Sequence, residues 1–493
     1  MSREWLSRFA YLEWEGLQEP WSIEHVSEAG GGIPIGSARI KLRRDDHYQV
    51  EGELTGTYVD ESELAFDVQP GTLARPLAID GQGNGYRYAL RRGYLRAYTS
   101  LLSLKEGVDH TFTSRLDYFE VTRTYDHREL PPVPRWLTQW YLNGPRSSDV
   151  FWRGTEREMV PHYTRARDTT LFKAPERPAQ SFSADHAFIE YGGKSFIIHQ
   201  VPREFGPSWS ANLGIEYRPE WGGIPAREKR IAIAEIVGFV LGRRLLNAGF
   251  TEYDELGDPI TEMVTSPPGD NIVAMCQASG PRPINVEPHS VGGRSIEDVL
   301  PSLVPAYLAL RESLRLNDAV WRYDMSRDLP VGIDLPVVAA AIEGVAALWL
   351  EANEARRIYL EPDRYNELLT EDLVRIEAKL QAEGIPDDDR QKMMNKLRGA
   401  YSMSGNESLY LFFKRIGLKV GKFERDAIKA RNPMAHGGPT MPKDLAKAST
   451  LRTAYQTLFV RMLLKLLKYD GFYIDYSSVG CPARHIDEPQ GGI

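Results

Sequence analysis

The segment DLPVVAAAIEGVAALWL, residues 334–350, marks the point where this chain of 493 residues becomes helical. Asp334 can cap a helix that has Pro336 in its first turn. Apolar residues then recur at helical spacing: Val338, Ile342, Val345, Leu348 and Trp349. The apolar run is too short for the ~20 residues of a membrane span, and Glu343 interrupts it. The segment therefore predicts a buried helix.

From this helix to the C-terminus the pattern stays helical. Further helices are expected at about 364–382, 387–400, 406–416, 418–431 and 443–468. The last of these carries an apolar stripe: Leu451, Tyr455, Leu458, Met462 and Leu466. Residues 328–493 are therefore predicted to form an all-α helical-bundle domain.

Before residue 328 the pattern is different. Residues 1–140 read as a β-rich domain, because stretches such as 38–42 and 48–54 alternate between apolar and polar residues. Residues 141–327 read as a mixed middle region, with a β-hairpin around Gly192-Gly193. That region also carries two expected helices, from Arg227 to Asn247 and from Ser295 to Leu314. The predicted fold class is a multidomain α+β protein.

Composition excludes several classes of protein. Hydrophobic residues make up 42% and charged residues 26%, which is ordinary for a soluble globular chain. The two cysteines, Cys276 and Cys481, cannot supply a disulfide framework or a cysteine-rich zinc site, and they favour the cytoplasm. The N-terminus does not resemble a signal peptide. We expect no membrane association, no metal site and no cofactor.

The candidate active site is the segment Arg431-Asn432-Pro433-Met434-Ala435-His436. Spacing alone is a weak signal, because Arg157 and His162 stand equally far apart. Helix phase is more informative: Arg431 continues the apolar stripe of 418–431 at the i+4 position after Ala427. An arginine on such a face is costly unless it is paired or functional. Pro433 predicts that the chain turns just after Arg431, which would bring the histidine back toward it.

Local charge gives a third indication. The formal net charge of the whole chain is −8, yet residues 411–468 hold thirteen basic and three acidic residues. This surplus of ten positive charges surrounds the candidate motif. Phosphate backbones bind such surfaces through the release of counterions. The segment therefore favours RNA as a partner.

With these features together, Arg431-Asn432-x3-His436 resembles the Arg-polar-x-His signature of HEPN ribonucleases. A HEPN domain placed last, behind a β-rich region, also resembles anti-phage defence proteins of the ApeA type. The resemblance implies a metal-independent endoribonuclease that acts through the 2′-OH and leaves 2′,3′-cyclic phosphate and 5′-OH ends. It implies a homodimer with a composite site, Arg431 and His436 as catalytic residues, and Asn432 as an orienting group. Lys429 is the candidate for contact with the RNA backbone.

Other readings stay open. Arg431 could be a cation at a helix end, and His436 a plain turn residue. The chain could be a HEPN protein that binds RNA, a nucleotide or a partner without cleavage, or the toxin of a toxin–antitoxin pair. In the defence reading, residues 1–327 would sense a phage-derived or nucleotide trigger and hold the ribonuclease in check.

Overall fold

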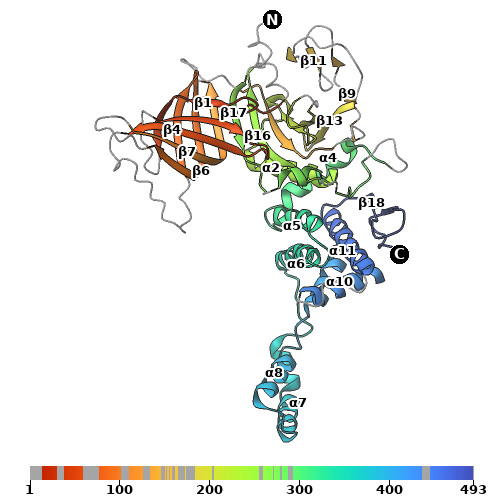
Figure 1. The fold of residues 1–493 in the computed structure, drawn as a ribbon. Coiled ribbons are helices and arrows are strands. Elements are labelled where there is room, and N and C mark those ends of the chain that lie inside the picture. Colours follow the sequence, from red (N-terminus) through yellow and green to blue (C-terminus); the bar gives the residue numbers. More distant parts are fainter. Residues whose placement is uncertain are drawn as a thin grey trace. The chain divides into compact units, whose positions relative to one another are not determined.

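The computed structural model describes residues 14–29, 38–58, 77–101, 110–125, 134–145, 150–151, 153–154, 156–157, 162–164, 172–173, 184–201, 205–254, 259–269, 271–277, 280–286, 293–435 and 445–491. The chain divides into two compact units, 1–308 and 309–493, here named the β-rich unit and the helical unit (Figure 1). The fold is mixed α+β, with strands in the N-terminal part and helices in the C-terminal half, as predicted.

The β-rich unit contains most of the described strands. They are β1 (Trp21–Ile23), β2 (His25–Ala29), β3 (Arg39–Arg44), β4 (Val50–Tyr58), β5 (Leu77–Gly83), β6 (Tyr86–Leu101), β7 (His110–Tyr125), β8 (Trp136–Leu142), β9 (Arg153–Gly154), β10 (Glu156–Arg157), β11 (His162–Thr164), β12 (Phe172–Lys173), β13 (Ala184–Tyr191), β14 (Lys194–Gln200), β15 (Leu213–Tyr217), β16 (Leu246–Tyr253) and β17 (Pro259–Thr265). Its helices are η3 (Pro219–Trp221), α2 (Arg227–Leu241), α3 (Ile272–Gln277) and α4 (Ile296–Leu310), the last of which ends two residues into the helical unit.

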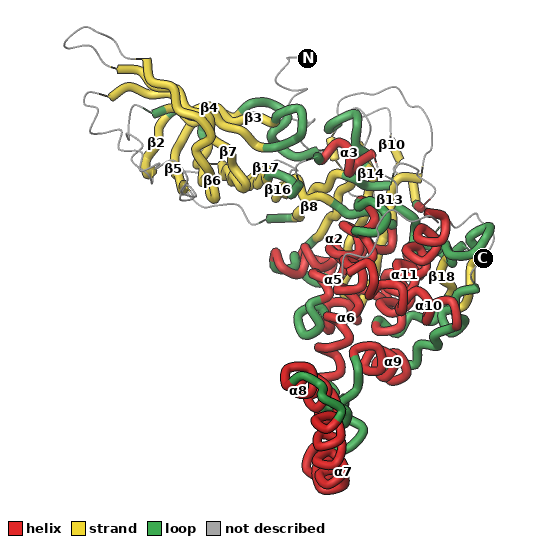
Figure 2. Tube along the Cα trace, turned by 60° about the horizontal axis from the view of Figure 1, so that its bottom comes forward, coloured by secondary structure: helices red, strands yellow, loops and turns green. Residues whose placement is uncertain are grey.

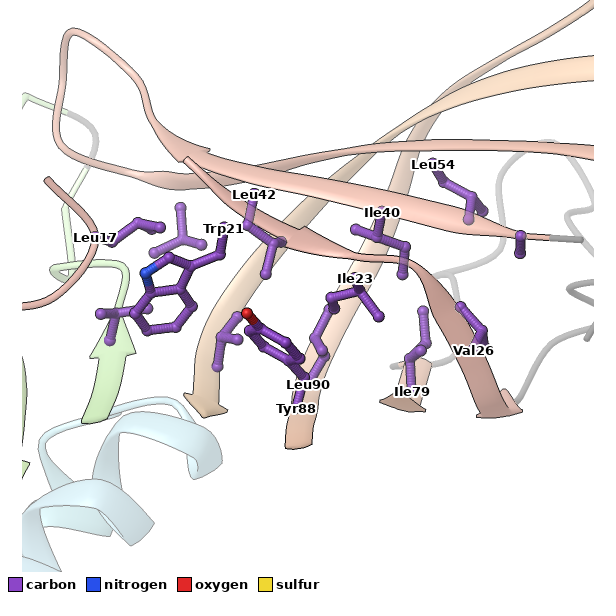
Figure 3. Close-up of a cluster of buried hydrophobic side chains, with 14 residues drawn as sticks. Leu17, Trp21, Ile23, Val26, Ile40, Leu42, Leu54, Ile79, Tyr88 and Leu90 are labelled. Atoms are coloured by element: carbon purple, nitrogen blue, oxygen red, sulfur yellow. The ribbon is translucent and has the colours of Figure 1, made fainter. Parts of the chain in front are cut away.

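The first seven strands form a closed ring of antiparallel pairs. β1 pairs with β3, β3 with β4, β4 with β7, β7 with β6, β6 with β5, and β5 with β2. β1 and β2 are separated only by Glu24, whose backbone N–H donates to the carbonyl of Gln82, so one stretch of chain closes the ring. Figure 3 shows the apolar side chains gathered inside it, among them Trp21, Ile40, Leu54 and Leu90.

The predicted alternation at 38–42 and 48–54 is confirmed, because β3 exposes Arg39 and Lys41 and buries Ile40 and Leu42. The inward line of β3 supplies this core, and its outward line is polar. Within this ring β1 and β2 each pair along one edge, with β3 and with β5, and the chain between them joins the two ends of the sheet.

Seven further strands extend the sheet from the far half of β7, while β10, β11 and β12 form a separate three-stranded sheet. β17 pairs with β7 over residues 120–124, and the order then runs β16, β8, β15, β14, β13 and β9. Helix α2 covers one face of this extension, where Nε of Arg230 donates to Oε1 of Gln139 at 3.0 Å. A second apolar cluster, containing Trp14, Trp140 and Phe205, lies against the extension. Both faces of β8 are therefore buried.

The predicted hairpin is confirmed: β13 and β14 pair around Gly192 and Gly193, both with positive φ, as a type I′ turn requires. The helix expected from Arg227 to Asn247 is shorter. It ends at Leu241, where Gly242 adopts the left-handed conformation and caps it, and residues 246–253 form β16 instead. Ser295 caps α4 as expected, since its Oγ accepts the N–H of Glu297.

The division into domains also differs from the three parts expected. Residue 140 lies inside β8, and β7 pairs with β17, so one sheet crosses the boundary expected at 140/141. The helical unit begins at residue 309 and includes α5 (Leu316–Asp328), which packs on α6 (Asp334–Ala352), so the boundary at 327/328 falls inside the last turn of α5. Alternation in the sequence identifies strands but not their partners, which here stand more than a hundred residues apart.

The helical unit follows the predicted order closely. After α5 and α6 come α7 (Pro362–Ala382), α8 (Asp387–Arg398), α9 (Gly405–Arg415), α10 (Lys422–Ala435) and α11 (Leu445–Leu466), then a small hairpin of β18 (Phe472–Ile474) and β19 (Ala483–His485). α6 packs against α5, α9, α10 and α11 (Figure 2). By length and hydropathy α6 could cross a membrane. Its contacts with four neighbouring helices make it the core helix of this bundle, as its sequence predicted.

Asp334 takes a different place from the one expected. It is the first residue of α6 and not the residue before the helix. Its buried carboxylate accepts the N–H groups of Gly332 and Leu335 and lies 3.1 Å from Nε of Arg452 on α11. Burial raises the pKa of Asp334, against these bonds and the charge of Arg452. The residue therefore ties the start of α6 to α11.

Helices α7 and α8 form a separate arm, residues 362–398, which Figures 1 and 2 show lying apart from α10 and α11. α7 buries no residue, and α8 buries only Met394. The two chain segments that enter and leave the arm are joined. The N–H of Tyr359 donates to the carbonyl of Tyr401, and that of Met403 donates to Arg357.

Candidate functional site

Helix α10 carries the first residues of the candidate motif. It runs from Lys422 to Ala435, so the backbone is still helical at Arg431 and Asn432 and continues past Pro433. The turn expected directly after Arg431 is therefore wrong. Proline removes one hydrogen bond and crowds the carbonyl four residues earlier. Pro433 stands two residues from the helix end, where few later bonds remain to be disrupted. His436 lies outside the described residues.

The phase of α10 agrees with the expected position of Arg431. Glu424, Ala427 and Ile428 are buried and form the line that faces the bundle. Arg431 occupies the position four residues after Ala427, which continues this line along the backbone. Asn432 occupies the next position around the helix. By backbone position, Arg431 thus belongs to the packed side of α10, and Asn432 to the side next to it.

A buried ion pair fixes α10 on α11. Arg461, in the middle of α11, pairs with Glu424 in the first turn of α10, and both side chains are 0% exposed. The other Nη of Arg461 donates to the carbonyls of Lys419 and Ile486, each at 3.1 Å. Glu424 in turn accepts the N–H of Gly421 at the start of α10. Charged groups at this depth are stabilised only when they are paired with each other and bonded to further polar groups.

The chain after α11, residues 469–491 and here named the tail, completes this network. Nε2 of Gln490 donates to Glu424 at 3.2 Å and to the carbonyl of Ala454 at 2.9 Å. The guanidinium of Arg461 lies 5.1 Å from the ring centre of Tyr473. The tail therefore joins the helix that carries the motif to the helix that follows it.

Asp475 holds the tail in its fold. Its buried carboxylate accepts bonds from Ser477, Ser478, Arg484 and the N–H of Gly491. Burial by itself would raise the pKa of Asp475, but the bonds from Ser477, Gly491, Ser478 and Arg484 outweigh it and hold the pKa below its ordinary value. Asp475 is thus charged throughout the neutral range and organises the segment that closes over Arg461.

The basic surplus around the motif divides into two sets. Arg452, Arg461 and Lys465 pair with Asp334, Glu424 and Asp487, so they hold the bundle together. The others that come before Arg431 in the chain are exposed: Lys414, Arg415, Lys419, Lys422, Arg425 and Lys429. Three of them, Lys422, Arg425 and Lys429, follow one another along one side of α10. The exposed basic surface is therefore smaller than the sequence count, and three of its residues lie on the helix of the motif.

Sequence reasoning missed the structural role of Arg461 and Glu424 and counted both as part of the charged surface. The signal available was the position of Arg461 inside the apolar run Leu458–Leu464. Glu343, which interrupts the apolar run of α6, is exposed on that helix. Arg157 and His162, with the same spacing as the motif, lie on strands β10 and β11 and not on a helix. In the parts of the chain that are described, no three His, Cys, Asp or Glu side chains converge as a metal site requires.

The comparisons with known proteins leave the family open. No family model, curated protein or solved structure matches this chain.

Proposed function

We propose that this chain is a metal-independent endoribonuclease of the HEPN type that acts in prokaryotic anti-phage defence, in the cytoplasm. Arg431 and His436 would be its catalytic residues, with Asn432 orienting the histidine or a phosphate oxygen. The β-rich unit would be the regulatory part that responds to the trigger. The observation that carries the proposal is the Arg-Asn-x3-His motif at the end of α10, a helix anchored on both sides by the bundle.

The proposed chemistry uses the RNA's own nucleophile. The 2′-OH attacks the adjacent phosphorus and loses its proton, and the 5′-oxygen leaves with a proton, which gives a 2′,3′-cyclic phosphate and a 5′-OH end. Histidine suits these proton transfers because its pKa is close to neutrality. Arginine suits the phosphorane because its planar fork binds two phosphate oxygens and keeps its charge. Two copies of the chain, each with its own motif, would supply the acid and the base.

Two features of the helical unit support this reading. The first is rigidity: the buried Arg461–Glu424 pair and the tail fix α10, and catalytic groups need a fixed frame. The second is charge: Lys422, Arg425 and Lys429 are exposed on α10 and come within about two and a half turns before the motif. A phosphate backbone that followed this side would reach the end of α10 beside Asn432, the motif position nearest to it around the helix.

The test uses matched single variants of the full chain. His436→Ala and Arg431→Ala should each lower the rate of RNA cleavage by at least ~100-fold, because each removes a group that acts in the transition state. His47→Ala and Arg364→Ala replace exposed residues of the same types and should cleave as the wild type does. Cleavage is measured on purified protein and in phage-infected cells, with the 2′,3′-cyclic phosphate as the diagnostic product.

Equal cleavage by all five proteins would contradict the proposal. RNA that binds but is cut by none of them, with or without infection, would favour the non-catalytic binding protein. Lys429→Ala separates binding from chemistry: it should weaken RNA binding for all sequences and lower the slope of log affinity against log salt by about one.

A further inference from the structure

A cavity of about 680 Å³ lies in the β-rich unit, beside the connection from β14 to β15 and the end of α3. Its size falls within the ~300–1,000 Å³ typical of small-molecule sites. Among the described residues its polar lining consists of Gln200, Ser208, Trp209, Ser210, Asn212 and Gln277. The described lining thus holds three amides, two hydroxyls and one indole, and no charged side chain.

The aromatic side of the cavity is fixed in place. Trp209 is half-buried and meets Tyr48 edge to face, with ring centres 6.2 Å apart. The Tyr48 hydroxyl donates to the buried Glu15 at 2.8 Å and accepts from Trp14. Burial raises the pKa of Tyr48 well above its ordinary value, and the charge of Glu15 adds to this effect. The indole of Trp209 therefore packs against a neutral phenol, which hydrogen bonds to Glu15 and Trp14 keep in position.

The amide side offers unused hydrogen-bonding groups. Asn212 is 5% exposed; its Nδ2 donates to the carbonyl of Phe205, and no described group donates to its buried Oδ1. Gln277 stands at the end of α3 with its side chain exposed. A buried acceptor without a donor costs about 1–3 kcal/mol, so a ligand that supplies the donor is favoured.

The chemistry of the described lining suits a flat ring with mixed donors and acceptors. A phosphate or carboxylate would meet no cation on the described lining. Asn and Gln amides can make paired bonds to the edge of a base, and aromatic side chains provide a surface for stacking. Hydroxyls such as that of Ser208 suit a ribose. We propose that this cavity is a binding site for an uncharged nucleoside, with the base beside Trp209 and its edge on the amides.

The experiment is calorimetric titration of the full chain with adenosine, guanosine, cytidine and uridine. At least one should bind with a dissociation constant below about 1 mM. Trp209→Ala and Gln277→Ala should each weaken that binding by about tenfold, the loss typical of one stacking or base-edge contact. Gln277 is exposed, so this variant keeps the fold even if Trp209→Ala disturbs the Tyr48 cluster. Gln82→Ala, at an exposed glutamine of β5, is the matched control and should bind as the wild type does.

Several outcomes would overturn the proposal. One is no binding of any nucleoside to the wild type. Another is equal binding by the wild type and all three variants, which would place the nucleoside elsewhere. Binding of maltose or N-acetylglucosamine in place of nucleosides, with the same losses in Trp209→Ala and Gln277→Ala, would assign the cavity to sugars. A nucleoside 5′-monophosphate that bound more than tenfold tighter than its nucleoside would contradict an uncharged ligand. None of these readouts depends on ribonuclease activity.

Discussion

Two helix pairs of the helical unit are each bridged by one arginine and one glutamate, and the two bridges differ in depth. Arg461 of α11 and Glu424 of α10 are 0% exposed. Arg398 of α8 and Glu377 of α7 lie 3.1 Å apart and are 50% and 42% exposed. The same two residue types therefore form a buried ion pair in one place and a solvent-exposed ion pair in the other. The difference decides what each pair of helices can do.

The buried pair belongs to a network, whereas the exposed pair stands among other surface pairs. Gly421, Gln490 and two backbone carbonyls also bond to Arg461 or Glu424. The arm instead carries ion pairs between residues three apart on one helix, such as Arg364–Glu367 and Lys392–Asp389. Water weakens the attraction between the charges of these exposed pairs. Packing holds α10 in one position, and that is the condition for the proposed chemistry at its end. The arm has no such constraint.

The largest effect is expected from breaking the buried bridge. Arg461→Met should lower the free energy of unfolding by about 3–5 kcal/mol, because Glu424 is left charged in the core without its partner. Urea denaturation of the full chain, followed by far-UV circular dichroism, measures this loss. Adding Glu424→Leu to Arg461→Met should recover much of the stability, since neither charge then remains buried. If Arg461→Met lowered the free energy of unfolding by less than about 1 kcal/mol, burial of the ion pair would not matter for stability.

A smaller effect is expected from loosening the tail that closes over the bridge. Asp475→Asn should cost about 1–3 kcal/mol at neutral pH, because bonds to a carboxylate are lost or weakened. The pKa of Asp475 in the folded chain lies below its ordinary 3.8, so its stabilisation is complete above that pH and is lost as pH falls through the folded pKa.

The pH dependence sharpens this prediction. The difference in melting temperature between wild type and Asp475→Asn should be largest near neutral pH and shrink below about pH 4. Thermal melts between pH 7 and pH 3 provide the measurement. A difference that stays constant over that range would argue against a charged Asp475 as the organiser of the tail.

The smallest effect is expected on the arm. Arg398→Met, the exposed counterpart of Arg461→Met, should change the free energy of unfolding by no more than about 1 kcal/mol. The same urea experiment measures both variants side by side. Equal losses in the two would abolish the contrast between the helix pairs.

Removal of the whole arm tests the same contrast on a larger scale. Residues 362–398 can be replaced by a short Gly-Ser linker, because the backbone bonds at Tyr359–Tyr401 and Met403–Arg357 already hold the two ends together. The melting temperature should stay close to that of the wild type. Collapse of the helical unit on this deletion would show that the arm contributes to its core.

The sequence predicted the helical unit better than the β-rich unit, for a physical reason. A helix is recorded in neighbouring residues, so the stripes of α6 and α11 could be recognised from spacing alone. The end of α2 was missed because Leu245 and Leu246 continue its apolar spacing, although Gly242 is the residue that stops it. The closed ring was not predicted, because strand alternation carries no record of the partner strand.

The catalytic and RNA-binding roles of the candidate residues stay predictions. The structure places Arg431 on α10 and shows Lys429 exposed. Pro433 misled, because a proline near a helix end disrupts less than one in the middle. The pairing of Arg461 with Glu424 across 37 residues left no periodic signal. The cavity also left no periodic signal in the sequence, because its lining residues are as far apart in the chain as Gln200 and Gln277.

The pairing of β7 with β17 has a consequence for the order of folding. Arg123 of β7 bonds to Glu262 of β17, and 139 residues separate them in the chain. A ribosome needs on the order of ten seconds to add that many residues. Until then β7 can pair with β6 along one edge and with β4 along the first half of the other edge. Residues 120–124 of β7 still lack their partner on that second edge, which is β17. During synthesis this part of β7 therefore has an unpaired edge. The edge becomes paired only after the ribosome has added β17, which ends at Thr265.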